Sequence, residues 1–316
     1  MTKATRRRRK GNTPLIPVGD SMPQESGELE EIETDEVVEI EDSESHAELV
    51  NAKAWAKSVK GRPKEPMLIE NILPAKPGEY IICAGGTGRG KTNLIINTAF
   101  SLATGVPFLD KFPCQECKVG LIFLEGDEDN LVDRYAKATK RYHDTDNLMV
   151  THLYPESPTV LLKKIGEAVK GCRVVLIDGA RYVVPGDYIK PRNCRDFTMA
   201  IREMLRQNEA SGILTFQVTK AYARGLITIP DVYSVKGGTD LVDDATTVVL
   251  IEKTPNKRSS DELTVYFGKH RASVIDLEGI DVRFDRDTCT FKLVQDIAIL
   301  DEDEKRKRED TIRMRY

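Results

Sequence analysis

The chain has 316 residues, of which 40% are hydrophobic and 31% are charged, and its formal net charge is -4. This composition is typical of a water-soluble globular protein with one large domain or two small ones. No stretch approaches 18 consecutive apolar residues, and the basic N-terminus lacks the apolar segment of a secretory signal. The six cysteines show no disulfide-framework spacing. We therefore expect a cytoplasmic protein without a membrane span.

Charge is distributed unevenly along the chain. Residues 3–10 carry six Lys or Arg and no acid, whereas residues 25–48 carry twelve acids and no Lys or Arg. Such single-sign segments repel themselves and lack the apolar residues of a core, so we predict a disordered acidic tail over 1–50. This tail either keeps the chain in solution or docks on the basic surface of a partner. The other predicted parts are a linker over 51–66, a folded domain over 67–295 and a charged tail over 296–316.

From residue 78 onward, short apolar runs alternate with segments of helical spacing. In chain order we predict a strand at 78–86, a helix at 92–105, a strand at 118–126, a helix at 128–142, a strand at 148–154, a helix at 157–171, a strand at 173–179, a helix at 195–212, and strands at 213–219, 246–253, 262–269 and 280–285. Apolar strands separated by helices predict an α/β fold with a mostly parallel sheet covered on both faces. The last strands follow one another without helices, which predicts antiparallel strands at one edge.

The segment GGTGRGKT (85–92) follows the first of these strands and opens the first helix. It matches the pattern G-x-x-x-x-G-K-[ST], in which glycines let backbone N–H groups turn toward an anion at a helix N-terminus. The lysine of this pattern reaches the β- and γ-phosphates, and the hydroxyl of the last residue binds Mg²⁺. We therefore predict a nucleoside triphosphate site made by Gly85, Gly86, Thr87, Gly88, Arg89, Gly90, Lys91 and Thr92.

Polar side chains stand at the ends of three neighbouring apolar strands. Because ligands lie beyond the carboxyl ends of parallel strands, we expect Glu125, Asp178 and Gln217 to face the phosphate site. Asp178 is placed to hold the Mg²⁺ shell, and Glu125 to orient or deprotonate an attacking water. Gln217 is suited to contact the γ-phosphate, with a hydrogen-bonded core amide as the alternative. The acids at 125–129 are also what a helix N-terminus favours, and both interpretations can hold together.

Four further segments carry a family resemblance. They are SLATGVPFLDKF (101–112), KVGLIFLEGDEDNLVDRYAK (118–137), VKGGTDLVDDATTVVLIEK (235–253) and FGKHRASVIDLEGIDVRFD (267–285). In their order and spacing, together with the phosphate loop, they resemble the RecA-type ATPase core, and within that class the RepA/DnaB-like hexameric replicative helicases. The resemblance covers roughly residues 65–293. It departs at KGGT (236–239), where these helicases carry RGSG. It also departs at ASV (272–274), where they carry NGP after two basic residues.

This resemblance implies a RecA-like three-layer α/β/α domain that hydrolyses ATP with Mg²⁺ in phage or plasmid replication. Lys91 and Thr92 then bind phosphate and Mg²⁺, Asp178 is the Walker B acid, Glu125 the catalytic base and Gln217 the sensor. The family assembles as a ring with each nucleotide between two subunits. A basic pair reaches the γ-phosphate of the neighbouring subunit, and here that pair is Lys269 and Arg271.

Two segments are candidates for contact with single-stranded DNA. In RecA-like rings the loops after the Walker B and sensor strands line the central channel, and here these are residues 180–193 and 220–236. Both mix basic residues with tyrosines, a combination that tracks a phosphate backbone and stacks bases. We expect both to be long loops, and long loops in compact domains are commonly functional, although an ordinary polar loop is the alternative.

Other interpretations stay open at this point. A recombination or repair ATPase that forms filaments on DNA, or a regulatory RecA-fold protein that binds ATP without unwinding, fits the same motifs. Replication or recombination proteins are candidate partners of the acidic tail. The pair Cys114 and Cys117 would need two more ligands to hold zinc, so packing or surface thiols are the preferred interpretation. Trp55 lies in a basic stretch that is a candidate for docking on a neighbouring subunit.

Overall fold

The computed structural model describes residues 51–60, 66–187, 190–219, 232–237, 239–254, 261–270 and 279–294. The chain divides into two units, Met1–Arg62 and Pro63–Tyr316. In the first unit the described residues form one helix, α1 (Ala52–Lys60), within the segment predicted as a linker. The predicted tails over 1–50 and 296–316 lie outside the described residues, so the predicted domain boundaries stay predictions.

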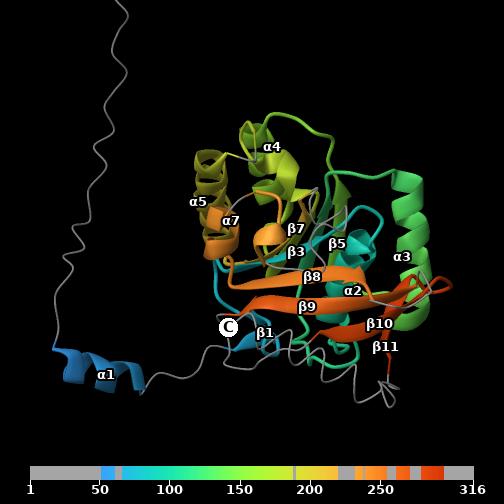
Figure 1. Ribbon diagram of the computed structural model, residues 1–316, viewed down its shortest axis with the longest axis horizontal. Coiled ribbons are helices and arrows are strands. Elements are labelled where there is room, and N and C mark those ends of the chain that lie inside the picture. The colour runs from blue at the N-terminus through green and yellow to red at the C-terminus, as the bar shows by residue number, and fades with distance from the viewer. Residues whose placement is uncertain are drawn as a thin grey trace, which may run out of the picture. The chain divides into compact units, whose positions relative to one another are not determined.

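The described residues of the second unit form a nine-stranded sheet (Figure 1), in the order β11-β10-β9-β8-β3-β7-β6-β4-β5. Its six parallel strands are β3 (Tyr80–Gly85), β4 (Val119–Phe123), β5 (Leu148–His152), β6 (Val174–Asp178), β7 (Ser211–Gln217) and β8 (Thr247–Lys253). Three antiparallel strands extend one edge: β9 (Glu262–His270), β10 (Ile280–Asp285) and β11 (Thr290–Leu293). The predicted α/β fold with an antiparallel edge is confirmed.

Helices cover both faces of this sheet (Figure 1). The helices are α2 (Lys91–Thr104), α3 (Glu128–Tyr142), α4 (Pro158–Ala168), α5 (Pro191–Gln207) and α7 (Thr239–Asp244). Successive residues of a strand point to opposite faces, so β3 sends Ile81 and Cys83 into the core under α2 and α3. Its Tyr80 and Ile82 enter the second core, under α4, α5 and α7. Strands buried on both faces explain the continuous apolar runs in the sequence.

Several elements differ from their predicted extent. Helix α5 begins at Pro191 and ends at Gln207, earlier at both ends than the predicted 195–212. The earlier start follows because proline is favoured in the first turn of a helix. Strand β11, the short helix α7 and the two-stranded pair β1 (Met67–Ile69) and β2 (Leu73–Pro74) were not predicted. Within the described residues no helix combines the length and apolar character that crossing a bilayer requires.

Candidate active site

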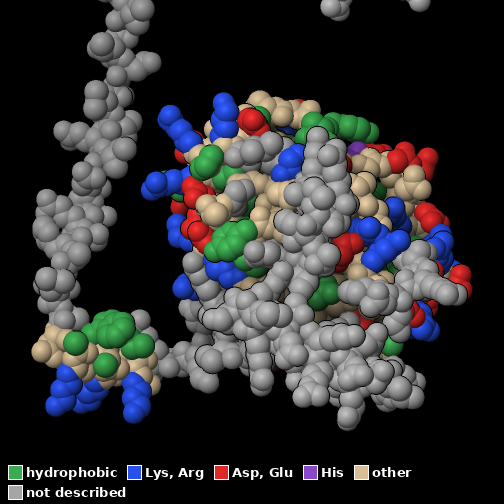
Figure 2. Space-filling model, in the orientation of Figure 1, with side chains coloured by type: hydrophobic (Ala, Val, Ile, Leu, Met, Phe, Trp, Pro, Cys, Tyr) green, Lys and Arg blue, Asp and Glu red, His purple; other side chains and the backbone are tan. Residues whose placement is uncertain are grey.

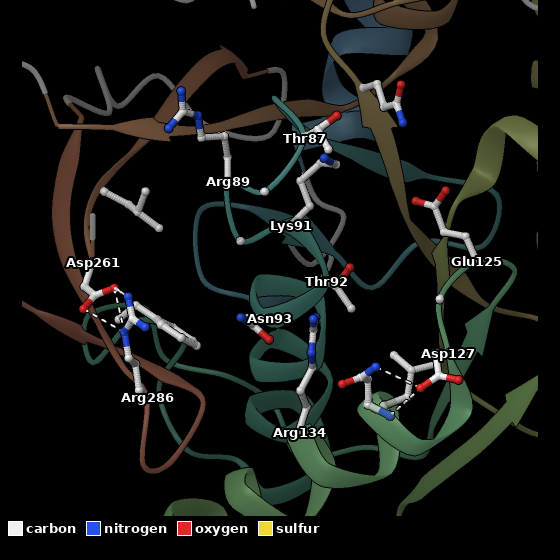
Figure 3. Close-up of a pocket in the computed structure, with 18 of the residues that line it drawn as sticks. Thr87, Arg89, Lys91, Thr92, Asn93, Glu125, Asp127, Arg134, Asp261 and Arg286 are labelled. Carbon is white, nitrogen blue, oxygen red and sulfur yellow. Dashed lines mark hydrogen bonds and ion pairs between the residues drawn. The ribbon is translucent and has the colours of Figure 1, made fainter. Parts of the chain in front are cut away.

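A cleft of about 780 Å³ opens at the carboxyl ends of the parallel strands (Figure 3). Figure 3 shows Lys91 and Thr92 at the start of α2, with Glu125 and Asp127 on one side and Asp261 and Arg286 on the other. The strand ends, the start of α2, the start of α3 and the antiparallel edge meet here. The lining residues are Thr87, Gly88, Arg89, Gly90, Lys91, Thr92, Asn93, Glu125, Gly126, Asp127, Asn130, Leu131, Arg134, Gln217, Lys253, Asp261, Leu263, Phe284 and Arg286.

The strand register brings the predicted residues to one edge of the sheet. Gly85 at the end of β3 is paired with Gln217 at the end of β7, and Asp178 at the end of β6 is paired with Phe123 of β4. Glu125 follows two residues after Phe123. Glu125 and Gln217 line the open cleft, whereas Asp178 is buried beneath it with 1% of its surface exposed.

The loop between β3 and α2 depends on glycine at two positions. A Cβ atom on Gly85 would lie 2.6 Å from the carbonyl oxygen of Ile251, so only glycine allows this close approach of β3 and β8. Gly90 has a φ of 85°, and a Cβ there would lie 3.1 Å from the Phe291 ring. No side chain in the described part of the chain caps α2. Its first-turn N–H groups therefore face the cleft as an anion site.

Two basic side chains of this loop, Lys91 and Arg89, form polar contacts with neighbouring residues of the chain. Lys91 Nζ donates a hydrogen bond of 3.0 Å to the Gly86 carbonyl. Burial lowers the pKa of the Lys91 ammonium, and the nearby Cys83, Asp178 and Glu125 partly offset this effect. Arg89 forms a 2.7 Å ion pair with Glu252 at the end of β8, which fastens the loop to the neighbouring strand.

Asp178 has one satisfied and one unsatisfied oxygen. Its Oδ1 accepts a 2.6 Å hydrogen bond from the Thr215 hydroxyl, which in turn accepts one of 2.8 Å from the Gly179 N–H. Its Oδ2 is buried and has no hydrogen-bond partner among the described residues. A buried carboxylate oxygen without a donor is costly unless a cation or its water shell satisfies it. Asp178 and the Thr92 hydroxyl at the start of α2 therefore fit the residues needed to hold Mg²⁺.

Glu125 is held by an arginine that the sequence did not single out for this contact. Arg181 Nη2 lies 2.9 Å from Glu125 Oε2 and also donates a 2.7 Å hydrogen bond to the Tyr182 hydroxyl. Both Glu125 and Arg181 have 29% of the side chain exposed, so the pair is partly shielded from water. Arg181 belongs to the 3-10 helix η1 (Ala180–Val183), which directly follows β6.

The side of the cleft opposite Glu125 combines apolar side chains with an ion pair (Figure 3). Asp261 and Arg286 lie on this side. Leu263 of β9 and Phe284 of β10, each two residues away from one of them in the chain, also line the cleft. The Phe284 ring packs against Phe291 with 5.2 Å between centroids. Arg286 pairs with Asp261 at 2.7 Å. We refer to this apolar part with its flanking ion pair as the edge lobe. No local pattern in the sequence predicts it, since its residues come from the separate strands of the antiparallel edge.

The sequence of residues 44–223, more than half of the chain, matches a family described as AAA domain. The chain belongs to the AAA domain family. The family consists of P-loop ATPases, so ATP hydrolysis with Mg²⁺ follows as the general activity of this domain.

Solved structures place the same AAA domain in the RecA-like fold. It is similar to a structure described as an ATPase domain, with a TM-score of 0.54 and 13% identity over 77% of this chain and 96% of that domain. It is also similar to a DnaB-like replicative helicase described with its interactions with primase, with a TM-score of 0.54 and 13% identity over 76% of this chain and 65% of that one. At this identity the likeness shows the fold. No curated protein matches the sequence.

The predicted trans-acting pair of the AAA domain is only partly described. Lys269 Nζ donates hydrogen bonds of 2.7 Å to the Val242 carbonyl and 2.6 Å to the Asp243 carbonyl, at the last turn of α7. Its ammonium is thus engaged within its own subunit. Arg271 lies outside the described residues, and both roles stay predictions.

The predicted loop at 180–193 is shorter than expected. Helix η1 occupies residues 180–183 and α5 starts at Pro191, so the argument from unusual loop length is wrong here. Lys190 and Arg192 are exposed at the start of α5. In the second segment, residues 220–231 lie outside the described residues, while Tyr233 is exposed on η2 (Val232–Ser234).

The cysteine pair of the AAA domain lies against the core under α2. Cys114 and Cys117 are both partly buried, and the Cys114 thiol donates to the Phe112 carbonyl. Burial raises the pKa of the Cys114 thiol to about 12 and that of Cys117 to about 11. The described residues contain no group of three or more His, Cys, Asp or Glu that fits a metal ion. These thiols therefore behave as packing groups.

Proposed function

We propose that this chain is an ATPase stimulated by single-stranded DNA, acting as a ring-forming motor of the DnaB-like replicative helicase type. The observation that carries the proposal is the cleft at the strand ends. In it the P-loop and Lys91 face Glu125, and Asp178 lies beneath with one unsatisfied oxygen among the residues that the structure describes.

Each side chain of the cleft has a separate role in hydrolysis. The loop N–H groups and Lys91 hold the β- and γ-phosphates, and Thr92 with Asp178 holds the metal. Mg²⁺, when bound, neutralises charge on the phosphoryl oxygens. Glu125 orients a water and accepts its proton as the water oxygen bonds to the γ-phosphorus and the bond to the β–γ bridging oxygen breaks, leaving ADP and phosphate. Gln217, from the strand between the P-loop strand and β6, contacts the γ-phosphate.

The edge lobe takes the nucleoside. Since the γ-phosphate must face Glu125 and Gln217, the other end of the nucleotide points to the opposite side of the P-loop. There the Phe284 ring offers a flat apolar surface for a base, and Leu263 adds an apolar contact. Arg134 of α3 supplies a further cation at the cleft wall. This division uses both sides of the cleft for one ligand.

Assembly into a ring is supported by the fold and by the exposed helix α1. The similar structures named above include a DnaB-like replicative helicase. Helix α1 carries Trp55 and Val59 on one face and lysines on the other, and all nine residues are exposed (Figure 2). We propose that this apolar face docks on a neighbouring subunit, because a nine-residue helix is not stable in isolation.

In the ring, Arg271 reaches the γ-phosphate of the adjacent subunit. Lys269, two residues earlier, anchors β9 to α7 through its two carbonyl contacts and so fixes the strand that ends one residue before Arg271. An arginine supplied in trans contributes several orders of magnitude to phosphoryl transfer. We therefore expect hydrolysis to depend on protein concentration.

The test is ATP hydrolysis with and without an oligo(dT) strand, combined with unwinding of a forked duplex and mass measurement of the complex. We expect DNA to raise the rate, the fork to open, and a closed ring to form with ATP. Filaments on DNA without unwinding would instead support the recombinase alternative. ATP binding without hydrolysis under all these conditions would support the regulatory alternative.

A further inference from the structure

Helix α1 carries its charged and its apolar side chains on opposite faces (Figure 2). Lys53, Lys57 and Lys60 follow the spacing i, i+4 and i+7, which places them on one face, and we refer to these three as the lysine face. Trp55 and Val59 lie on the other face and are 57% and 39% exposed. The apolar face is the one proposed above to dock on a neighbouring subunit, so the lysine face is left for a different contact.

The lysine face is unfavourable for the helix by itself. Helix α1 contains no Asp or Glu, and its lysines form no ion pair with any residue that the structure describes. Like charges three and four residues apart destabilise a helix, and a helix of nine residues is marginal in water. The first turn also lacks the acid that a helix N-terminus favours. A polyanion bound along this face would remove the repulsion between the lysines.

Negative charge that matches this face lies just before it in the chain. Residues 25–48 carry twelve acids and no Lys or Arg, and this segment, outside the described residues, ends five residues before Lys53. Residues 51–64 carry five Lys or Arg and no acid, whereas residues 67–316 carry 36 Lys or Arg and 37 acids. The excess positive charge is therefore concentrated around α1. Closing so short a loop also costs little entropy.

A second basic segment, residues 3–10, is the other candidate for contact with these acids, since it carries six Lys or Arg. Helix α1 is favoured because its backbone already holds the three ammonium groups on one face. Asn51 caps this helix, its Oδ1 accepting a 2.9 Å hydrogen bond from the Lys53 N–H. A preorganised set of charges binds a polyanion at a lower entropic cost than a set that must first be ordered.

We propose that the acidic segment 25–48 docks on the lysine face of α1 in the same chain and shields it from other polyanions. The contact joins carboxylates to ammonium groups at an exposed surface, so it weakens as salt rises. Nucleic acid competes for the same site, because its phosphates also form a polyanion. The inference concerns the first unit alone and does not depend on ATP hydrolysis by the second.

Carbodiimide cross-linking of the full-length chain, followed by mass spectrometry, tests the docking directly, because this reagent joins a carboxylate to an amine in contact with it. Glu31 is the informative acid, since it lies 21 residues after Lys10 and 22 residues before Lys53. At low salt we expect Glu31 to link to the lysine face in preference to Lys10. These links should largely disappear at about 1 M salt, where the Debye length is about 3 Å. Mixed isotope-labelled and unlabelled chains show whether a link lies within one chain.

Binding of a labelled oligo(dT) strand, measured by fluorescence anisotropy without nucleotide, tests the shielding. A variant with the twelve acids of residues 25–48 replaced by Gln or Asn should bind more tightly than the wild type. Each freed lysine adds about 0.7 to the salt slope for a single strand, so the plot of log K against log salt should be steeper by about 2. Adding Lys53→Gln, Lys57→Gln and Lys60→Gln to this variant should return both the affinity and the slope to the wild-type values.

The matched control replaces three exposed lysines on or next to α4 by Gln in the same acid-free variant. These are Lys163, Lys164 and Lys170, and here the tighter binding should persist. Equal linking of Glu31 to Lys10 and to the lysine face would overturn the docking. Tighter oligo(dT) binding that survives the loss of the lysine face would overturn the shielding, because the acids would then act through cations outside α1.

Discussion

Replacing Thr215 by valine tests the buried carboxylate at the centre of the site. The Thr215 hydroxyl donates to Asp178 Oδ1 at 2.6 Å and accepts from the Gly179 N–H at 2.8 Å, with 2% of the residue exposed. Valine keeps the shape and removes both bonds. A hydrogen bond to a charged group contributes about 1.5–3 kcal/mol, and a stranded buried N–H costs about 1–3 kcal/mol. We expect the free energy of unfolding to fall by about 3–5 kcal/mol, the middle of the summed range.

Thermal and urea unfolding without nucleotide measure this effect. At about 2–4 °C per kcal/mol for a domain of this size, Tm should fall by about 6–20 °C. Thr98→Val is the matched control, because its buried hydroxyl donates at 2.7 Å to Leu94 O, a carbonyl of the same helix. That change should cost less than about 1 kcal/mol. Equal Tm losses in both variants, or none in Thr215→Val, would refute the reasoning.

Three further predictions concern the P-loop lysine, the edge lobe and the cysteines. Lys91→Met should weaken ATP binding at least about a hundredfold, because charge-assisted bonds to phosphate are lost, yet raise Tm of the ligand-free chain at pH 7. The sign follows because the pKa of Lys91 is lower in the folded than in the unfolded chain. At a pH below both pKa values, the buried ammonium of the wild type lowers its stability, and methionine removes this cost. The Tm difference between Lys91→Met and the wild type therefore shrinks as pH rises through the folded pKa. Phe284→Ala should weaken binding of ATP about tenfold but leave binding of tripolyphosphate unchanged in titration calorimetry; equal losses for both ligands would contradict the edge lobe assignment. Cys114 and Cys117, with pKa values of about 12 and about 11, should react with a disulfide reagent at about pH 8 far more slowly than an exposed thiol, and rapid reaction would show that they are not packed as described.

The P-loop and the strand ends could be predicted because they are local. The spacing of Gly85, Gly90 and Lys91 fixes the phosphate loop, and an apolar run ending in Asp178 or Glu125 marks a buried strand and its exit. Parallel pairing then brings such ends to the same edge whatever their distance along the chain. This is why the fold class was predicted correctly from pattern alone.

The contacts between separate segments could not be predicted. The pairing of Arg89 with Glu252, far along the chain, depends on β8 lying next to β3, which no local pattern encodes. The ion pair between Glu125 and Arg181 likewise needs the β4–β6 register. Lys269 was interpreted from family resemblance, whereas its carbonyl partners belong to α7, a six-residue helix too short to show a period.

The predicted start of helix α5 was wrong for a related reason. Pro191 and Arg192 were assigned to the loop over 180–193, although a proline at the first turn starts α5 there. The polar first turn packs little apolar surface, so hydrophobic periodicity begins only further along, at Cys194 and Phe197. Proline position was the signal that could have corrected the boundary.

The central claim is that Glu125 acts on a nucleotide held by the P-loop, and Glu125→Gln tests it most directly. Glutamine keeps the size of the side chain and removes the proton acceptor. We predict that ATP hydrolysis falls about 10²–10⁴-fold, while the Kd for ATP with Mg²⁺, measured on the same preparation, stays within about threefold of the wild-type value. Hydrolysis at the wild-type rate in this variant, with binding intact, would contradict the account.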